Sequence, residues 1–149
     1  MPDPRLARIT GANRGVRFHV AKALAARGAT VLLGSRDLAR GEAAAQAIGP
    51  GAIALQLDVT DRASIAAAAE RVGSEFGRLD LLVINAAISN TRKQQLGPSL
   101  QEYAKLSLAS NAALESVEDG AREVVRVALL GPAGPSGTFT RWENTTIPW

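Results

Sequence analysis

The sequence predicts an α/β domain in which helices cover both faces of a parallel sheet. Strand-like and helical patterns alternate between residues 6 and 87 in the order βαβαβαβ, which gives parallel strands with right-handed crossovers. A glycine-containing turn joins the first strand to the first helix. The chain has 149 residues, of which 46% are apolar, so a single domain with a substantial core is expected.

The first half of this pattern is regular. The first strand is expected over residues 6–10, although it contains a charged residue, Arg8. Apolar residues at helical spacing predict a helix over residues 16–27, which Gly28 ends. Residues 29–33 form a nearly continuous apolar run, which is typical of a strand buried on both faces.

The next two units follow the same logic. Asp37 is expected to cap an Ala-rich helix that runs to residue 48. Residues 52–57 predict the third strand, and either Thr60 or Asp61 caps a helix that ends before Gly77. The apolar residues 81–84 begin the fourth strand, which runs towards residue 87.

The pattern weakens beyond Asn90. Residues 99–114 are weakly helical, with a few apolar contacts. A capping-box-like start at Ser116 and an apolar stripe that reaches Ala128 predict a firmer C-terminal helix. Residues 131–137 are rich in glycine and proline and predict a loop, and residues 138–142 have the composition of a strand.

Composition and charge exclude several classes of function. The absence of cysteine and the single histidine predict neither disulfides nor a metal site. The net charge is +3, but the basic residues are scattered and aromatic residues make up 4%, which does not favour nucleic-acid binding. The sequence has no apolar signal core and no run near the roughly 20 residues that cross a bilayer, so a cytoplasmic protein without membrane contact is expected.

The turn after the first strand has the layout of a phosphate-binding site. It reads Thr10-Gly11-Ala12-Asn13-Arg14-Gly15-Val16-Arg17. A helix that starts at such a turn directs unpaired amides and the positive end of its dipole at an anion. Two interpretations are open at this point: the glycines only permit a tight connection, or they also let a ligand approach the backbone.

Two further motifs follow in order. They are Leu57-Asp58-Val59 after the third strand and Asn85-Ala86-Ala87 at the end of the fourth. With the Thr-Gly-x-x-x-Gly turn, they make the chain resemble the short-chain dehydrogenase/reductase family, in its carbonyl-reductase-like branch. The resemblance covers residues 6–89 and 116–149. It implies a truncated, doubly wound Rossmann-like domain with sheet order 3-2-1-4, completed by a C-terminal helix and strand.

The same resemblance divides the single domain, residues 1–149, into three stretches. Residues 1–90 correspond to the nucleotide-binding half of the family. Residues 91–115 form a short linker and helix in place of the family's fifth and sixth strands and their helices. Residues 116–149 correspond to the C-terminal helix and strand.

The resemblance also implies residues for a dinucleotide cofactor. Gly11 makes the tight turn, Gly15 lets the backbone approach the pyrophosphate, and Asn13 and Arg14 flank the adenosine phosphate. Arg36, at the end of the second strand, would accommodate a 2′-phosphate, which indicates NADP rather than NAD.

Three more cofactor contacts follow from the later motifs. Asp58 corresponds to the acid that meets the adenine amino group, and Asn85 and Ala86 line the ribose side. Taken alone, Arg36 is also typical of a solvated surface charge, and Asp58 of a turn or cap residue.

Arg17 departs from the family pattern because it takes the place of the third glycine. Its guanidinium either clamps a phosphate or occupies the space where the pyrophosphate or nicotinamide would lie. We favour obstruction. Because Arg8 stands where a buried central strand would carry an apolar residue, we also expect a first strand that is more open than the family pattern.

The family's catalytic pattern is missing from the sequence. In the family a tyrosine donates a proton to the carbonyl, a lysine four residues later assists it, and a serine orients the substrate. Here Tyr103 and Lys105 are two residues apart, which places them on different faces of a helix. Tyr103 is more typical of an aromatic at the core edge, beside a solvated lysine. Ser89 is a plausible polar residue of the pocket.

Three functional hypotheses remain. The first is a repurposed dehydrogenase that has lost hydride transfer and binds or transforms a carbonyl or polyketide-like compound by cyclisation, isomerisation or dehydration. Arg17, Asn85, Ser89 and Tyr103 would supply its hydrogen bonds or proton transfer. The second is an NADP-dependent carbonyl reductase with a remodelled site, in which Tyr103 and Lys105 are the candidates. The third is a non-catalytic interaction protein.

The absence of the family's later strands also predicts that the protein forms an oligomer. Loss of the strands beyond the fourth would leave an apolar strand edge that must be covered. Residues 138–142 could pair there within one chain or from a second copy, and the loop before them would tolerate such an exchange. We expect a homodimer.

Overall fold

A computed structural model describes residues 5–84, 117–131, 134, 139–140 and 146–147. Within them, four parallel strands form a sheet in the order β3-β2-β1-β4, which confirms the predicted topology. The strands of this sheet are β1 (Leu6–Thr10), β2 (Thr30–Ser35), β3 (Ala52–Gln56) and β4 (Leu81–Val83). The helices are α1 (Gly15–Ala25), α2 (Leu38–Ile48), α3 (Arg62–Phe76) and α5 (Val117–Ala128).

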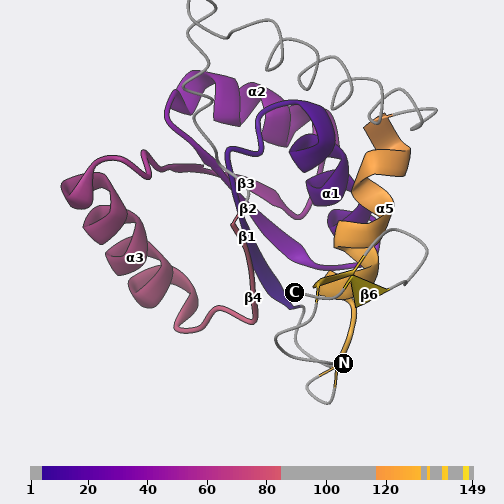
Figure 1. Cartoon of the computed structure of the whole chain (residues 1–149). Helices are drawn as coiled ribbons and strands as arrows, with labels where there is room; N and C mark the ends of the chain where they lie inside the picture. Colours follow the sequence, from indigo (N-terminus) through magenta and orange to yellow (C-terminus); the bar gives the residue numbers. More distant parts are fainter. Residues whose placement is uncertain (1–4, 85–116, 132–133, 135–138, 141–145, 148–149) are drawn as a thin grey trace, which may run out of the picture.

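Helices lie on both faces of the sheet (Figure 1). On one face α1, α2 and α5 pack over a core that includes Ile9, Leu24 and Leu33, and each of these side chains is at most 2% exposed. On the other face α3 packs over a smaller core that includes Leu32 and Leu57. The alternation of side chains along each strand therefore divides the apolar residues between two layers.

Side-chain caps explain where α2 and α3 begin, whereas α1 ends at Ala25, two residues before its predicted end at residue 27. Asp37 caps α2 by accepting a hydrogen bond from the backbone N–H of Arg40 at 3.2 Å. Of the two candidate caps for α3, Asp61 takes the role, because its Oδ1 accepts from the N–H of Ala63 at 3.0 Å. Thr60 is instead bonded to Asp58.

The C-terminal strand was expected to pair at the free edge of the fourth strand, but it pairs elsewhere. Strand β5 (Phe139–Thr140) pairs antiparallel with β6 (Thr146–Ile147) in a separate two-stranded sheet. It therefore does not extend the main sheet beside β4 in the described part of the chain. The expected helix over residues 99–114 lies outside the described residues.

Arg8 lies in the middle of β1, on the α3 face, in register with Leu32 and Leu82. Its side chain is half-buried, whereas the other four residues of β1 are buried, so the first strand is open only at this position. The Nε atom of Arg8 is buried and lacks a hydrogen-bond partner among the described residues. Leaving such a donor unsatisfied typically costs about 1–3 kcal/mol.

We therefore expect Arg8→Leu to raise the free energy of unfolding by about 1 kcal/mol. This corresponds to an increase in Tm of about 2–4 °C for a chain of this size, measured by thermal denaturation. The control is Arg62→Leu, because Arg62 is exposed at the start of α3, and that change should stay within about 0.5 kcal/mol. A lower Tm for Arg8→Leu would mean that the guanidinium has a stabilising partner.

Asp80 connects the beginnings of β1 and β4. Its Oδ2 accepts hydrogen bonds from the backbone N–H of Leu6 at 2.7 Å and from Nε of Arg78 at 3.1 Å. In return, the backbone N–H of Asp80 donates to the carbonyl of Leu6 at 3.0 Å. The N–H of Leu6, and then the Arg78 guanidinium, hold the pKa of Asp80 below its ordinary value of 3.8.

Because this pKa is lowered by folding, the ionised carboxylate stabilises the protein above about pH 4, and the stabilisation disappears as the pH falls through the lowered pKa. Asp80→Asn should therefore lower Tm at pH 7 and lose its effect in strong acid. Thermal denaturation of both proteins between pH 2 and pH 7 measures this. An unchanged difference across that range would assign the effect to bond geometry rather than to charge.

Candidate functional site

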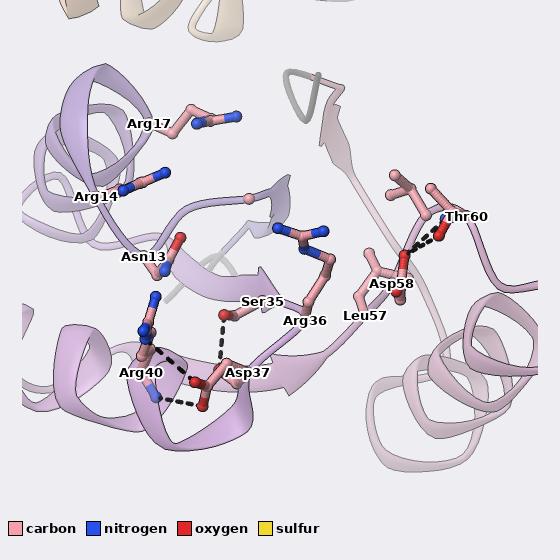
Figure 2. A pocket seen from close by; sticks show the side chains of 12 residues that line it. Asn13, Arg14, Arg17, Ser35, Arg36, Asp37, Arg40, Leu57, Asp58 and Thr60 are labelled. Atoms are coloured by element: carbon pink, nitrogen blue, oxygen red, sulfur yellow. Dashed lines mark hydrogen bonds and ion pairs between the residues drawn. The ribbon is translucent and has the colours of Figure 1, made fainter. Parts of the chain in front are cut away.

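A pocket of about 160 Å³ lies at the carboxyl ends of β1, β2 and β3 (Figure 2). In open α/β sheets this edge is where ligands bind. The residues that line it come from the three connections that leave these strands: Gly11, Asn13, Arg14, Arg17, Ser35, Arg36, Asp37, Arg40, Leu57, Asp58, Val59 and Thr60.

The β1–α1 turn forms one wall. Gly11 has φ 65° and Gly15 has φ 63°, a left-handed conformation that suits glycine. The N–H of Ala12 donates to the carbonyl of Gly34 at 3.1 Å and holds the turn against β2. Arg14 is the N-cap residue of α1 but makes no side-chain capping bond. The first-turn amides of α1 therefore suit an anionic ligand.

Basic residues dominate the pocket. Its lining contains Arg14, Arg17, Arg36 and Arg40, against two acidic residues. Figure 2 shows Arg36 in the middle of the opening, with Arg14 and Arg17 on the α1 wall. Guanidinium groups bind phosphate through charge-assisted, often bidentate hydrogen bonds, so this arrangement suits a phosphorylated ligand.

Asp37, one of the two acids, is already committed to α2. Besides capping the helix, its Oδ2 lies 3.2 Å from Nε of Arg40. The hydroxyl of Ser35 donates to the carbonyl of Asp37 at 2.8 Å and fixes the backbone at the end of β2. The carboxylate of Asp37 is therefore engaged by its own helix rather than presented to a ribose.

Asp58, the second acid, lies on the opposite wall from α1 (Figure 2). Its Oδ1 accepts from the backbone N–H of Thr60 at 2.9 Å and from the Thr60 hydroxyl at 2.7 Å. These two bonds, with a smaller contribution from Arg36, hold the pKa of Asp58 below its ordinary value. Asp58 is thus ionised at neutral pH, and it serves both as a turn residue and as part of the pocket lining.

Six of the predicted site residues come together in this pocket, and a seventh, Gly15, begins α1 beside it. The six are Gly11, Asn13, Arg14, Arg17, Arg36 and Asp58. The other predicted residues lie outside the described part of the chain: Asn85, Ala86, Ser89, Tyr103 and Lys105.

Sequence reasoning missed Arg40 and the second role of Thr60. Arg40 follows the helix cap Asp37 by three residues, which places it one turn into α2 on the side of the cap. That spacing was visible in the sequence. Thr60 was considered only as a cap of α3, whereas it anchors Asp58.

The described residues were also compared with the requirements of a metal site and of a membrane-spanning helix. Among the described residues, no group of three or more His, Asp and Glu side chains is close enough to hold a metal ion. Within the same part of the chain, no helix has the length and apolar character needed to cross a membrane.

The family model for short chain dehydrogenase matches residues 5–133. This chain belongs to the short-chain dehydrogenase family. The resemblance to this family that the three motifs carry is therefore confirmed.

Known members show the extent of the similarity. Galactitol 2-dehydrogenase from Agrobacterium fabrum is 51% identical over 84 residues, which cover 56% of this chain and 33% of that protein. (-)-Isopiperitenone reductase from Mentha piperita is 39% identical over 126 residues, covering 80% of this chain and 39% of that protein. This short-chain dehydrogenase thus spans well under half the length of these relatives.

Solved structures agree with the fold. Menthone neomenthol reductase from Mentha piperita has a TM-score of 0.59 at 33% identity, covering 75% of this chain and 41% of that one. A 3-ketoacyl-(acyl-carrier-protein) reductase from Brucella melitensis, complexed with NADH, has a TM-score of 0.55 at 34% identity, covering 69% and 43%. The family therefore indicates a nicotinamide cofactor for this type of site.

Proposed function

We propose that this short-chain dehydrogenase binds NADP(H) in the basic pocket but has lost ordinary hydride transfer. The observation that supports the cofactor is the charge at the end of β2, where Arg36 and Arg40 line the pocket and Asp37 is engaged by Arg40. Proteins that prefer NAD place an acid there for the ribose 2′-hydroxyl, whereas an arginine accommodates the 2′-phosphate.

The remaining contacts follow from the walls of the pocket. The amides at the start of α1 and the Arg14 guanidinium would hold the pyrophosphate. Asp58 and Val59, on the opposite wall, would face the adenine. When bound, such a cofactor supplies a hydride acceptor or donor at its nicotinamide ring. The chain's own residues at this site bind and orient the phosphates.

The loss of hydride transfer is proposed from the sequence. Carbonyl reduction needs a proton donor positioned beside the substrate. The sequence holds a single tyrosine, Tyr103, and no lysine four residues beyond it. A reaction without net redox change, such as cyclisation, isomerisation or dehydration of a carbonyl compound, needs only hydrogen bonding and proton transfer. Ser89 and Tyr103 remain predicted contributors to such a reaction, and Arg17 lines the pocket beside the start of α1.

NADP-dependent carbonyl oxidoreduction is the second candidate. It is favoured by the names of the relatives, which include galactitol 2-dehydrogenase, (-)-isopiperitenone reductase and 3-oxoacyl-[acyl-carrier-protein] reductase. In that case Tyr103 and Lys105 would provide the remodelled proton donor.

Titration with NADPH and NADH, followed by the fluorescence of the reduced cofactor, tests the proposal. We expect NADPH to bind at least about tenfold more tightly than NADH, the value of one charge-assisted contact. We also expect no oxidation of NADPH with a panel of carbonyl compounds. Turnover of NADPH would instead establish the oxidoreductase. Absence of binding would refute NADP(H) recognition and leave two alternatives, a cofactor-independent enzyme and a non-catalytic interaction protein, which a substrate screen would distinguish.

We also propose that the protein is a homodimer. The support is the α3 face near β4, where Leu82 is 42% exposed and Ile84 is 76% exposed. Large apolar side chains gathered at an edge strand are typical of an interaction surface. Light scattering after size exclusion should give twice the 15.5 kDa chain mass at micromolar concentration. Leu82→Glu should shift the mass towards the monomer, whereas a monomeric parent protein would contradict the proposal.

A further inference from the structure

We infer that Arg17 restricts the pocket to the adenosine half of the cofactor. The ligand class would then be adenosine 2′,5′-bisphosphate and its derivatives, and the nicotinamide half would add little affinity. This inference rests on the NADP(H) recognition proposed above and concerns the same pocket.

The pocket itself covers only one side of the sheet edge. Its lining comes from the β1–α1, β2–α2 and β3–α3 connections. With the sheet order β3-β2-β1-β4, those connections lie over β1, β2 and β3, and β4 lies beyond β1. A dinucleotide that crosses this edge must therefore leave the pocket past the start of α1 to reach β4.

Arg17 stands at that exit. It is the third residue of α1, so it belongs to the first helical turn. Side chains in a helix lean towards the N-terminus, which directs a long one at residue 17 over the ligand-binding end. Arg17 is half-buried and lines the pocket. Figure 2 shows it beyond Arg14, on the side away from Arg40.

The charges favour a ligand with two phosphate groups. Arg14 and Arg17 flank the start of α1, and Arg36 and Arg40 flank the end of β2. The acids of the pocket are Asp37, paired with Arg40, and Asp58 on the facing wall. A 5′-phosphate can bind at the first pair and a 2′-phosphate at the second.

The Arg17 guanidinium would also stabilise the bound bisphosphate, besides blocking the nicotinamide half of a dinucleotide. A glycine at the same place would leave room for the second half of a dinucleotide, whereas arginine fills that room with hydrogen-bond donors for the first phosphate. The protein would then gain little affinity from the nicotinamide half of a dinucleotide. It would gain affinity instead from a stronger contact between Arg17 and the 5′-phosphate of adenosine 2′,5′-bisphosphate.

Isothermal titration of the full chain with adenosine 2′,5′-bisphosphate and with NADP⁺ tests this. We expect NADP⁺ to bind no more than about threefold more tightly than the bisphosphate. Arg17→Ala should weaken bisphosphate binding roughly tenfold, the value of a lost charged contact. Arg17→Gly should weaken it similarly and, by clearing the exit, make NADP⁺ the tighter ligand by about tenfold.

Each outcome decides a different claim. If the unmodified protein binds NADP⁺ more than about threefold better than the bisphosphate, the restriction by Arg17 is wrong and NADP(H) recognition stands. If neither ligand binds at millimolar concentration, both proposals fail. This comparison of two ligands uses only the unmodified protein, so it remains decisive even if a variant does not fold. Circular dichroism would check that Arg17→Ala and Arg17→Gly keep the helix content of the unmodified protein.

Discussion

Replacing Arg36 with glutamate is expected to weaken NADPH binding by about 100-fold or more. Arg36 is exposed, projects into the middle of the pocket and has Asp58 across the opening (Figure 2). A charge-assisted bond to phosphate is worth about 1.5–3 kcal/mol, or roughly 10–150-fold in affinity, and reversal of the charge adds repulsion. Fluorescence titration with NADPH measures the change.

NADH provides the internal comparison for this variant. It lacks the 2′-phosphate, and a carboxylate at the end of β2 can accept a hydrogen bond from its ribose hydroxyl. The affinity for NADH should therefore stay constant or rise, and the cofactor preference should invert. Arg62→Glu, at an exposed arginine on α3 outside the pocket, should change neither affinity. Equal weakening of both cofactors by Arg36→Glu would show that Arg36 does not read the 2′-phosphate.

The features that were predictable from the sequence are those set by local chemistry. The βαβ alternation, the glycine turn and the cap at Asp37 depend on residues close in the chain, and the structure has all of them. The sheet order came from the resemblance, because strand order is a property of the whole fold rather than of any one segment. Its confirmation rests on the register between β1, β2, β3 and β4.

What could not be predicted depends on contacts between segments or on competition between neighbours. Thr60 and Asp61 were equal candidates to cap α3, and the choice follows from Asp58, which binds the Thr60 hydroxyl and leaves Asp61 to the helix. Strand β5 pairs with β6 over just two residues, and so short a strand leaves no periodic pattern in the sequence. Likewise, the sequence does not reveal that Nε of Arg8 is buried without a hydrogen-bond partner among the described residues, because that depends on how segments distant in the chain pack around β1.

The pocket has two parts that can be considered separately, the glycine turn and the arginine side chains. The glycine turn and sheet edge are sufficient for a generic anion site. In the proposed site, the four arginines would add selectivity for the number and position of phosphate groups. The pocket therefore combines a glycine turn at the sheet edge with a cluster of four arginines, and each arginine can be tested separately from the turn.

Gly15→Ala tests the turn itself and is expected to lower NADPH affinity by at least about tenfold. Gly15 has φ 63°, and an added Cβ would meet no atom within 4 Å. Protein packing therefore does not oppose the methyl group, and the strain of a left-handed residue costs about 1–2 kcal/mol. In the proposed site a phosphate would approach the backbone of this turn at the start of α1, so the same methyl group should obstruct the ligand.

Gly28→Ala is the matched control. Gly28 has φ 84°, has no atom within 4 Å of an added Cβ, and lies after the opposite end of α1. Both variants should therefore lose similar stability in thermal denaturation, while only Gly15→Ala loses NADPH binding. Equal loss of binding in both would assign the effect to destabilised folding. Full binding by Gly15→Ala would show that no phosphate approaches this turn, so the proposed cofactor site would have to be abandoned.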